Sequence, residues 1–416
     1  MSFKLIWLSL LITTSFVLNS QEQEVNPPEY IKSITFKSSS SNLGELPIMK
    51  LGEPFYLEFD ALVSNEPDFY YKIQHCDYNW KPSVLVKSEY LLGIDNFRIQ
   101  DYQNSFNTFQ LYSHYKLSLP NSQTKQLKVS GNYIISIYNN SRDLVFSRKF
   151  MIYEDIVTPG IAIKRSRDVS NIETTQTVDI EIAAGRSVNN PQQTVKTLII
   201  QNNNLNTAIG NLKPQYTVGN KLIYRYIKET AFPGGNEYLF FETKDVRAAT
   251  MRVQAIALED IYQAYLFMDG SRKNVPYTYN PDINGQFKIV AIDRDDVSVE
   301  ADYVQVHFSL QYPELLDGKN IYVYGNYNNF ALNDENRMDF YPEGRVYKTK
   351  LKLKQGFYNY KYVVVDKNGI LDEGAISGNF WQTENNYKVL VYYRNLGARY
   401  DRIIGFNQVS STNITN

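Results

Sequence analysis

Apolar and polar residues alternate with a period of two along much of the chain. Successive side chains of a β-strand point to opposite faces, so this alternation predicts half-buried antiparallel strands. The clearest examples lie at residues 55–61, 133–137, 178–182, 303–310 and 347–354. Helical periodicity is scarce; residues 247–260 are the best helix candidate, although 250–256 also fit a strand. The pattern predicts an all-β protein, and many short strands with turn signals favour sandwich packing.

A coarse repeat divides the chain into modules. A glycine followed shortly by tyrosine precedes an apolar run at residues 131–133, 235–238 and 356–358. The glycines lie 104 and 121 residues apart, close to the size of an immunoglobulin-like sandwich of about 100 residues. In such sandwiches a tyrosine at the start of a late strand often bonds back to the preceding corner. Turn-rich sequence near 155–160 and 282–289 separates the modules.

The first 20 residues have the composition of a secretory signal peptide. Lys4 precedes an apolar stretch at 5–18, and the small residue Ser20 follows. The stretch is shorter than the roughly 20 residues that a membrane-spanning helix needs. We therefore expect a signal peptide followed by three tandem immunoglobulin-like β-sandwich domains and a flexible tail, with the limits 1–20, 21–156, 157–287, 288–405 and 406–416.

The composition restricts the class of protein further. The 43 basic residues balance 44 acidic ones, so a nucleic-acid partner is not expected. One cysteine excludes an intrachain disulfide. No apolar run after residue 20 is long enough to span a membrane. The 34 tyrosines fit either the pleated surface of β-sheets or docking on another protein, where the ring buries area while its hydroxyl still hydrogen-bonds.

The candidate chemistry is weak. Cys76 follows His75, but neighbours on a strand point to opposite faces, so a buried core cysteine is favoured over a nucleophile. The three histidines lack the spacing of metal ligands. The acids of 293–296 lack the glycine turn and distal glutamate of a calcium loop. We expect neither an enzyme nor a cofactor. The lysines of 348–354 form either a solvent-facing strand or a patch for an acidic partner.

One segment resembles a known family. Residues 75–121 contain an ordered set of polar and aromatic residues: His75, Cys76, Asp77, Trp80, Pro82, Ser83, Glu89, Tyr90, Gly93, Asp101, Tyr102, Ser105, Asn107, Thr108, Tyr112, His114, Tyr115, Leu119, Pro120 and Asn121. This set resembles the plug proteins of the type IX secretion system of the Bacteroidetes. Residues 394–405 resemble the closing segment of the same family.

The resemblance implies a function that the residues alone do not give. In that family, the plug is a periplasmic protein that closes the idle pore of a very large outer-membrane β-barrel. It implies a non-enzymatic, monomeric protein at the periplasmic face of the outer membrane, with the barrel translocon as its partner. It marks a set of residues for docking or for internal support, without distinguishing the two: Asp77, Trp80, Ser83, Asn107, Thr108, Tyr112, His114 and Tyr115.

The third module carries a second resemblance. Residues 322–330 and 356–363 resemble the glycogen-binding, early-set sandwich modules, with Phe330 in place of their turn tryptophan and Tyr327 in place of a phenylalanine. In that family, exposed aromatic rings stack on sugars; here the same residues could be turn and core elements alone. The alternative function is therefore a periplasmic carbohydrate-binding protein. A hydrolase whose carboxylates no motif marks is a third hypothesis.

Overall fold

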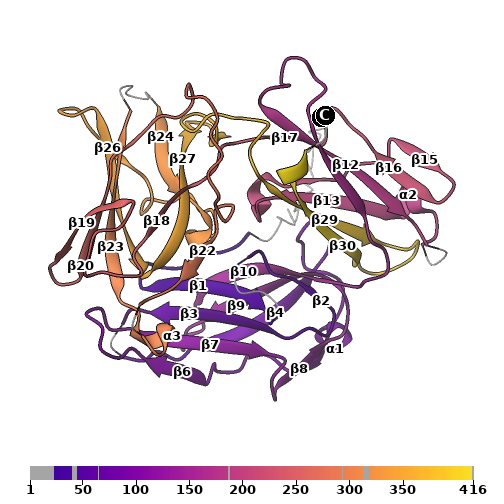
Figure 1. Cartoon of the computed structure of the whole chain (residues 1–416). Helices are drawn as coiled ribbons and strands as arrows, with labels where there is room; N and C mark the ends of the chain where they lie inside the picture. The colour runs from indigo at the N-terminus through magenta and orange to yellow at the C-terminus, as the bar shows by residue number, and fades with distance from the viewer. Residues whose placement is uncertain are drawn as a thin grey trace, which may run out of the picture.

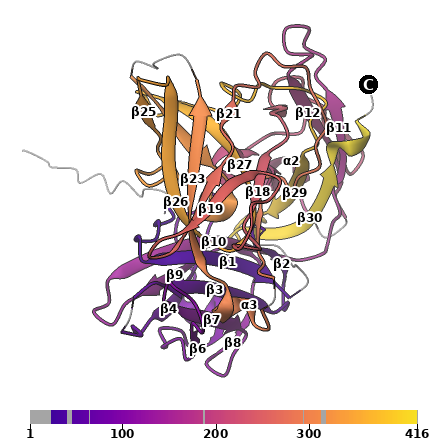
Figure 2. The same ribbon diagram turned by 60° about the vertical axis from the view of Figure 1, so that its left-hand side comes forward.

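The computed structural model describes residues 23–39, 45–63, 65–185, 188–292, 294–312 and 318–414. The expected signal peptide at 1–20 lies outside these residues. Three β-sandwiches pack against one another, with the first below the other two in Figure 1. After a rotation of 60°, the first sandwich still lies beneath both of the others (Figure 2), and residues of the first sandwich contact each of them.

The first sandwich contains two four-stranded sheets of order β1-β3-β7-β6 and β2-β10-β9-β4, and a ribbon of β5 and β8. Its core is rich in aromatic rings, including Phe59, Phe69 and Phe146. Its elements are β1 (Ile31–Ser38), β2 (Ile48–Lys50), β3 (Phe55–Ala61), β4 (Tyr70–Cys76), α1 (Lys87–Tyr90), β5 (Leu91–Gly93), β6 (Asp101–Asn104), β7 (Ser113–Leu119), β8 (Thr124–Leu127), β9 (Gly131–Tyr138) and β10 (Leu144–Tyr153).

The second sandwich is built from two separate stretches of the chain. One sheet has the order β11-β12-β16-β15, with β17 beside β12, and the other has the order β14-β13-β29-β30. Its elements are β11 (Gly160–Arg165), β12 (Thr175–Ala183), α2 (Pro191–Thr194), β13 (Val195–Gln201), η1 (Leu205–Thr207), β14 (Ile209–Gly210), β15 (Tyr216–Val218), β16 (Lys221–Tyr224), β17 (Ala231–Pro233), β29 (Asn386–Tyr393), β30 (Arg402–Ser410) and η3 (Ser411–Asn413).

The third sandwich is formed by the stretch between them. One sheet has the order β19-β20-β23-β26-β25, with β21 beside β23, and the other centres on β27, which pairs with β18, β22, β24 and β28. Its elements are β18 (Leu239–Glu242), β19 (Val253–Leu258), β20 (Tyr262–Leu266), β21 (Asp269–Gly270), β22 (Phe287–Ile289), α3 (Val297–Glu300), β23 (Tyr303–Gln311), β24 (Lys319–Tyr324), η2 (Asn326–Asn328), β25 (Asp339–Tyr341), β26 (Val346–Lys354), β27 (Gly356–Asp366) and β28 (Leu371–Asp372).

The strand pairing does not follow the expected limits 157–287 and 288–405. Strands β18 to β22, at 239–289, pair within the third sandwich, whereas β29 returns to pair with β13 of the second. Residues 406–410 belong to β30 and 411–413 to η3, so the expected flexible tail at 406–416 is wrong for its described part. From the pairing, we propose the domain limits 31–154, 160–233 with 386–410, and 239–372.

Two other local expectations have clear outcomes. The best helix candidate, 247–260, is wrong: residues 253–258 form β19, because they pair with β20 in the sheet. The expected tyrosine corner is present in two modules. The hydroxyl of Tyr133 donates to the Val129 carbonyl at 2.8 Å, and the Tyr358 hydroxyl donates to the Lys354 carbonyl at 2.5 Å. The repeated Gly–Tyr pattern therefore marks the start of a strand where a tyrosine bonds back to the preceding turn. It does not mark domains of equal length.

Candidate functional site

The first half of the family segment forms a joint between the first and second sandwiches. Tyr78, just after β4, inserts between the sheets: its hydroxyl donates to the Thr197 carbonyl at 2.9 Å and accepts from the Asn211 N–H at 2.7 Å. Its backbone N–H donates to the Asp401 carboxylate at 3.0 Å, and its ring meets the edge of Tyr392. Side chains from both sandwiches form one buried cluster around it. We call this contact the Tyr78 joint.

Three of the predicted site residues shape the turn that carries Tyr78. The Asp77 carboxylate accepts from the N–H groups of Asn79 and Lys81 at 2.8 and 2.9 Å. Trp80 has a positive φ of 63°, is 6% exposed and lies beneath the Lys149 ammonium, 4.7 Å from its ring centre. The Ser83 hydroxyl hydrogen-bonds to Nδ1 of His75 at 2.8 Å. The contacts of all three residues are with other parts of the first sandwich, and they stabilise the turn.

His75 and Cys76 point to opposite sides of β4, as expected. Cys76 is buried in the Tyr78 joint, whereas the ring of His75 packs among Tyr90, Tyr133 and Tyr400. Burial lowers the pKa of His75 from 6.5 to about 4. Gly131, at a φ of 144°, is needed here because a Cβ would lie 2.5 Å from Nε2 of the imidazole. His75 is therefore a neutral packing residue.

His75 should make the fold sensitive to acid. Its pKa is lower in the folded chain than the ordinary value of 6.5, so the stability that it contributes is complete above pH 6.5 and falls as the pH drops towards 4. The loss approaches about 3 kcal/mol by pH 4. Urea unfolding at pH 7, 5.5 and 4.5 should show a steeper decline for the wild type than for His75→Gln. Equal declines would contradict this assignment.

The second half of the family segment forms a joint between the first and third sandwiches. The Tyr112 hydroxyl donates to the Ala301 carbonyl at 2.9 Å, and its ring lies under the Lys354 ammonium at 4.1 Å. His114 hydrogen-bonds through Nδ1 to Oδ1 of Asp60 at 2.7 Å. Oδ2 of Asp60 accepts from the Lys354 ammonium and from the Tyr303 hydroxyl, both at 2.7 Å. We call this contact the Asp60–Lys354 joint.

The Asp60–Lys354 joint is a buried ion pair. The side chains of Asp60 and Lys354 are 1% and 2% exposed, so neither charge is solvated by bulk water. Burial alone would raise the pKa of Asp60, but Lys354 and His114 outweigh it and lower that pKa. Burial also lowers the pKa of Lys354, partly offset by Asp60. The expectation that 348–354 is a solvent-facing lysine row is wrong at Lys354, because the first sandwich covers the end of β26.

The remaining predicted site residues lie in a loop and in the core of the first sandwich. Asn107 adopts a φ of 55°, and the Thr108 hydroxyl donates to the Gln110 carbonyl at 3.0 Å, so both shape the loop between β6 and β7. Tyr115 lies in the core of the first sandwich, stacked on Phe59. The structure thus separates the eight residues into two joints, a loop and a core position rather than joining them in one site.

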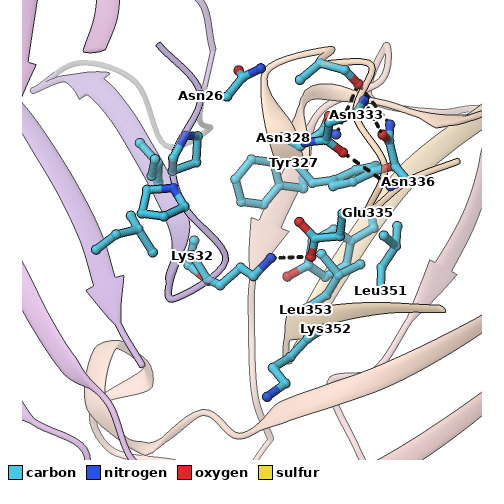
Figure 3. Close-up of a pocket in the computed structure, with 18 of the residues that line it drawn as sticks. Asn26, Lys32, Tyr327, Asn328, Asn333, Glu335, Asn336, Leu351, Lys352 and Leu353 are labelled. Carbon is cyan, nitrogen blue, oxygen red and sulfur yellow. Dashed lines mark hydrogen bonds and ion pairs between the residues drawn. The ribbon is translucent and has the colours of Figure 1, made fainter. Parts of the chain in front are cut away.

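Two of the cavities lie where the sandwiches meet. One of about 60 Å³ lies between β1 and the third sandwich (Figure 3). In that view, Lys32 reaches across to pair with Glu335, and Tyr327 lines the opposite wall. A larger cleft of about 720 Å³ opens at the junction of all three sandwiches, beside Trp80 and Phe330. Both spaces are lined by residues of more than one sandwich.

The expected sugar-stacking residues do not form a platform. Phe330 is 2% exposed and packs against Tyr324, and the Tyr327 hydroxyl donates to the Val323 carbonyl at 2.6 Å. Their rings serve the interior of the third sandwich. Among the described residues, no group of three or more His, Cys, Asp or Glu could hold a metal ion. Within the same residues, no helix is long and apolar enough to cross a membrane.

Sequence reasoning missed an exposed apolar part of the family segment. Phe106, Phe109 and Leu111 are 68%, 52% and 60% exposed. They belong to the same loop as Asn107 and Thr108, and we call them the 106–111 ridge. Their position could have been predicted from the sequence, because they are large apolar residues in a loop rich in Ser and Asn. Such loops ordinarily carry polar side chains at the surface.

The comparisons with known proteins agree with this architecture. A family model described as "Type 9 secretion system plug protein 1st domain" matches residues 31–154. The crystal structure of a hypothetical protein from Parabacteroides merdae superposes with a TM-score of 0.88 at 33% identity, over 93% of this chain and 98% of that chain. A Salmonella alpha-2-macroglobulin reacted with methylamine aligns at 9% identity over 91% of this chain and 24% of that chain, but its TM-score of 0.14 carries no structural argument. No curated protein matches.

The fold and the two joints define a class: an all-β protein of three sandwiches held in a fixed arrangement by contacts of the first domain. The first domain covers the span of the matching family model. The chain belongs to the type IX secretion system plug protein family, and its role is therefore related to that secretion system.

Proposed function

We propose that this protein is a non-enzymatic, periplasmic plug that closes the idle outer-membrane barrel of the type IX secretion system. The observation that carries the proposal is the use of the family segment, which fixes the first sandwich to the other two through the Tyr78 and Asp60–Lys354 joints. A stopper must keep its shape when it meets a wide opening. Buried contacts on two sides of one domain supply that rigidity.

Reversible closure sets a requirement for the outer surface. A plug that leaves when cargo arrives needs an interface of polar and aromatic contacts rather than a large apolar core. The buried tyrosines of this chain serve its own domains, so the docking contacts are expected among the exposed residues. No observation favours sugar binding, because Phe330 is enclosed.

The proposal predicts a leaking outer membrane when the protein is missing. Deletion of its gene should sensitise cells to a large antibiotic that intact outer membranes exclude, and the wild-type gene should restore resistance. Affinity purification from the native envelope should recover a very large outer-membrane barrel, identified by mass spectrometry. Addition of glucans to the purified protein should leave its tryptophan fluorescence unchanged. Unaltered permeability together with no barrel in the purified material would refute the plug function.

A further inference from the structure

The 106–111 ridge is an apolar surface without a partner in the chain's own fold. Its three large side chains lie within six residues, and each is more than half exposed. Exposed apolar side chains scattered singly are ordinary, whereas a contiguous group of this kind marks a contact site. Phe109 retains one internal contact, an edge-to-face approach to Tyr262 at 5.3 Å between ring centres. The rest of the ridge faces outwards.

The loop that carries the ridge is held rigidly by the third sandwich. The Phe106 N–H donates to the Val299 carbonyl at 2.9 Å, and the Phe109 N–H donates to Oδ1 of Asp302 at 2.7 Å. The Ser105 N–H donates to the Tyr112 carbonyl at 2.8 Å, closing the base of the loop. A loop fixed before binding loses little entropy on association, so its exposed side chains can contribute fully to affinity.

A row of cations begins beside the ridge. The Lys352 ammonium donates to Oε1 of Gln110 at 3.0 Å, which joins β26 to the loop. Lys350 and Lys348 follow on the same face of β26 and are exposed. On the neighbouring strand β23, His307 pairs with Lys350, and its ring stacks on that of Tyr265 with 4.3 Å between the ring centres. The ridge is therefore bordered by basic and aromatic side chains.

We propose that the 106–111 ridge and the adjoining row of Lys348, Lys350 and Lys352 form the surface that docks on the translocon barrel. This assignment rests on the proposed plug function. The partner surface is a protein face with an apolar pocket for the ridge and carboxylates beside it, since opposite charges across an interface guide docking and set its register. Phenylalanine anchors seated in pockets supply the affinity.

A second exposed apolar patch supplies a matched control. Val84, Val86 and Ile94 of the first sandwich are 66%, 59% and 56% exposed. They are aliphatic, and their charged neighbours Glu89 and Arg399 pair with each other. The patch therefore has comparable exposed apolar side chains, but its three members are aliphatic and it does not adjoin the lysine row of β26.

The test measures the affinity of purified protein for the detergent-solubilised barrel from a plug-deleted strain. Phe106→Ser/Phe109→Ser/Leu111→Ser should raise Kd at least about 30-fold, as expected for the loss of an interface anchor. Val84→Ser/Val86→Ser/Ile94→Ser should change Kd less than about threefold. Lys348→Glu/Lys350→Glu should slow association about tenfold and weaken its salt dependence. The exposed pair Lys319→Glu/Lys367→Glu controls for net charge. All variants should keep the wild-type melting temperature.

The outcomes separate the docking surface from the plug function. If the wild type binds the barrel and the ridge variant binds equally well, the docking surface is wrong and the plug function stands. If the Val84 variant loses binding instead, the surface lies on the other patch. If the wild type binds no barrel, the plug function itself fails. Binding of the wild type, but not of the ridge variant, to phosphatidylglycerol vesicles without barrel affinity would assign the ridge to a lipid surface and overturn the proposal.

Discussion

Lys354→Met is expected to lower the free energy of unfolding by about 3–5 kcal/mol, because it leaves the buried Asp60 carboxylate without its cation. The other partners of Asp60, His114 and Tyr303, each make one hydrogen bond to its carboxylate. Burial of an uncompensated charge costs far more than the loss of an exposed pair. The change should therefore separate the first and third sandwiches before either unfolds.

Urea unfolding followed by tyrosine fluorescence measures this loss. The double variant Asp60→Asn/Lys354→Met should recover much of the stability, since no isolated charge is left in the joint. Lys350→Met, on the same strand but exposed, should change the free energy of unfolding by less than about 0.5 kcal/mol. A Lys354→Met protein as stable as the wild type would show that Asp60 reaches solvent.

Tyr78→Ala should cost about 3–5 kcal/mol, the usual cost of removing a buried aromatic side chain. The ring fills the Tyr78 joint and its hydroxyl joins two backbone groups of the second sandwich. Tyr78→Phe keeps the ring and removes only the hydroxyl, so it should cost about 1–3 kcal/mol. The difference between the two variants separates packing from hydrogen bonding in this joint.

Chemical denaturation and small-angle X-ray scattering measure the effect of Tyr78→Ala. The free energy of unfolding should fall, and the radius of gyration of the still-folded protein should rise as the first and second sandwiches separate. Tyr216→Ala, which removes a tyrosine that is 57% exposed, should change neither quantity. An unchanged radius of gyration in Tyr78→Ala would mean that the second sandwich is held by other contacts.

The sequence predicts the strands far better than their partners. Alternation is a local property, and it correctly identifies 55–61, 178–182 and 303–310 as strands. Nothing local tells that β18 pairs with β27 or that β29 returns to β13, since each strand would fit any antiparallel neighbour. The strand pairing differs from the expected domain limits for this reason, because hydrogen bonds between β13 and β29, about 190 residues apart, cannot be read from local sequence.

The candidate residues show the same limit. The alternation places Lys354 and Leu353 on opposite faces of β26. The face that carries Lys354 is buried at its end only because the first sandwich packs against it. The family segment also marks Tyr112, but its hydrogen-bond partner Ala301 lies 189 residues further along the chain, in the third sandwich. Phe106 and Phe109 were overlooked because exposure of an aromatic residue in a loop depends on what covers the loop.

The return of β29 and β30 to the second sandwich has a consequence for biosynthesis. A ribosome releases the chain from the N-terminus, so residues 160–233 emerge with one sheet lacking two of its four strands. Edge strands left open in this way invite proteolysis and aggregation. Residues 386–410, which contain β29 and β30, complete that sheet. A polypeptide that ends before β29 would keep the open edge of β13, so we expect proteases to degrade it faster than a chain that contains both strands.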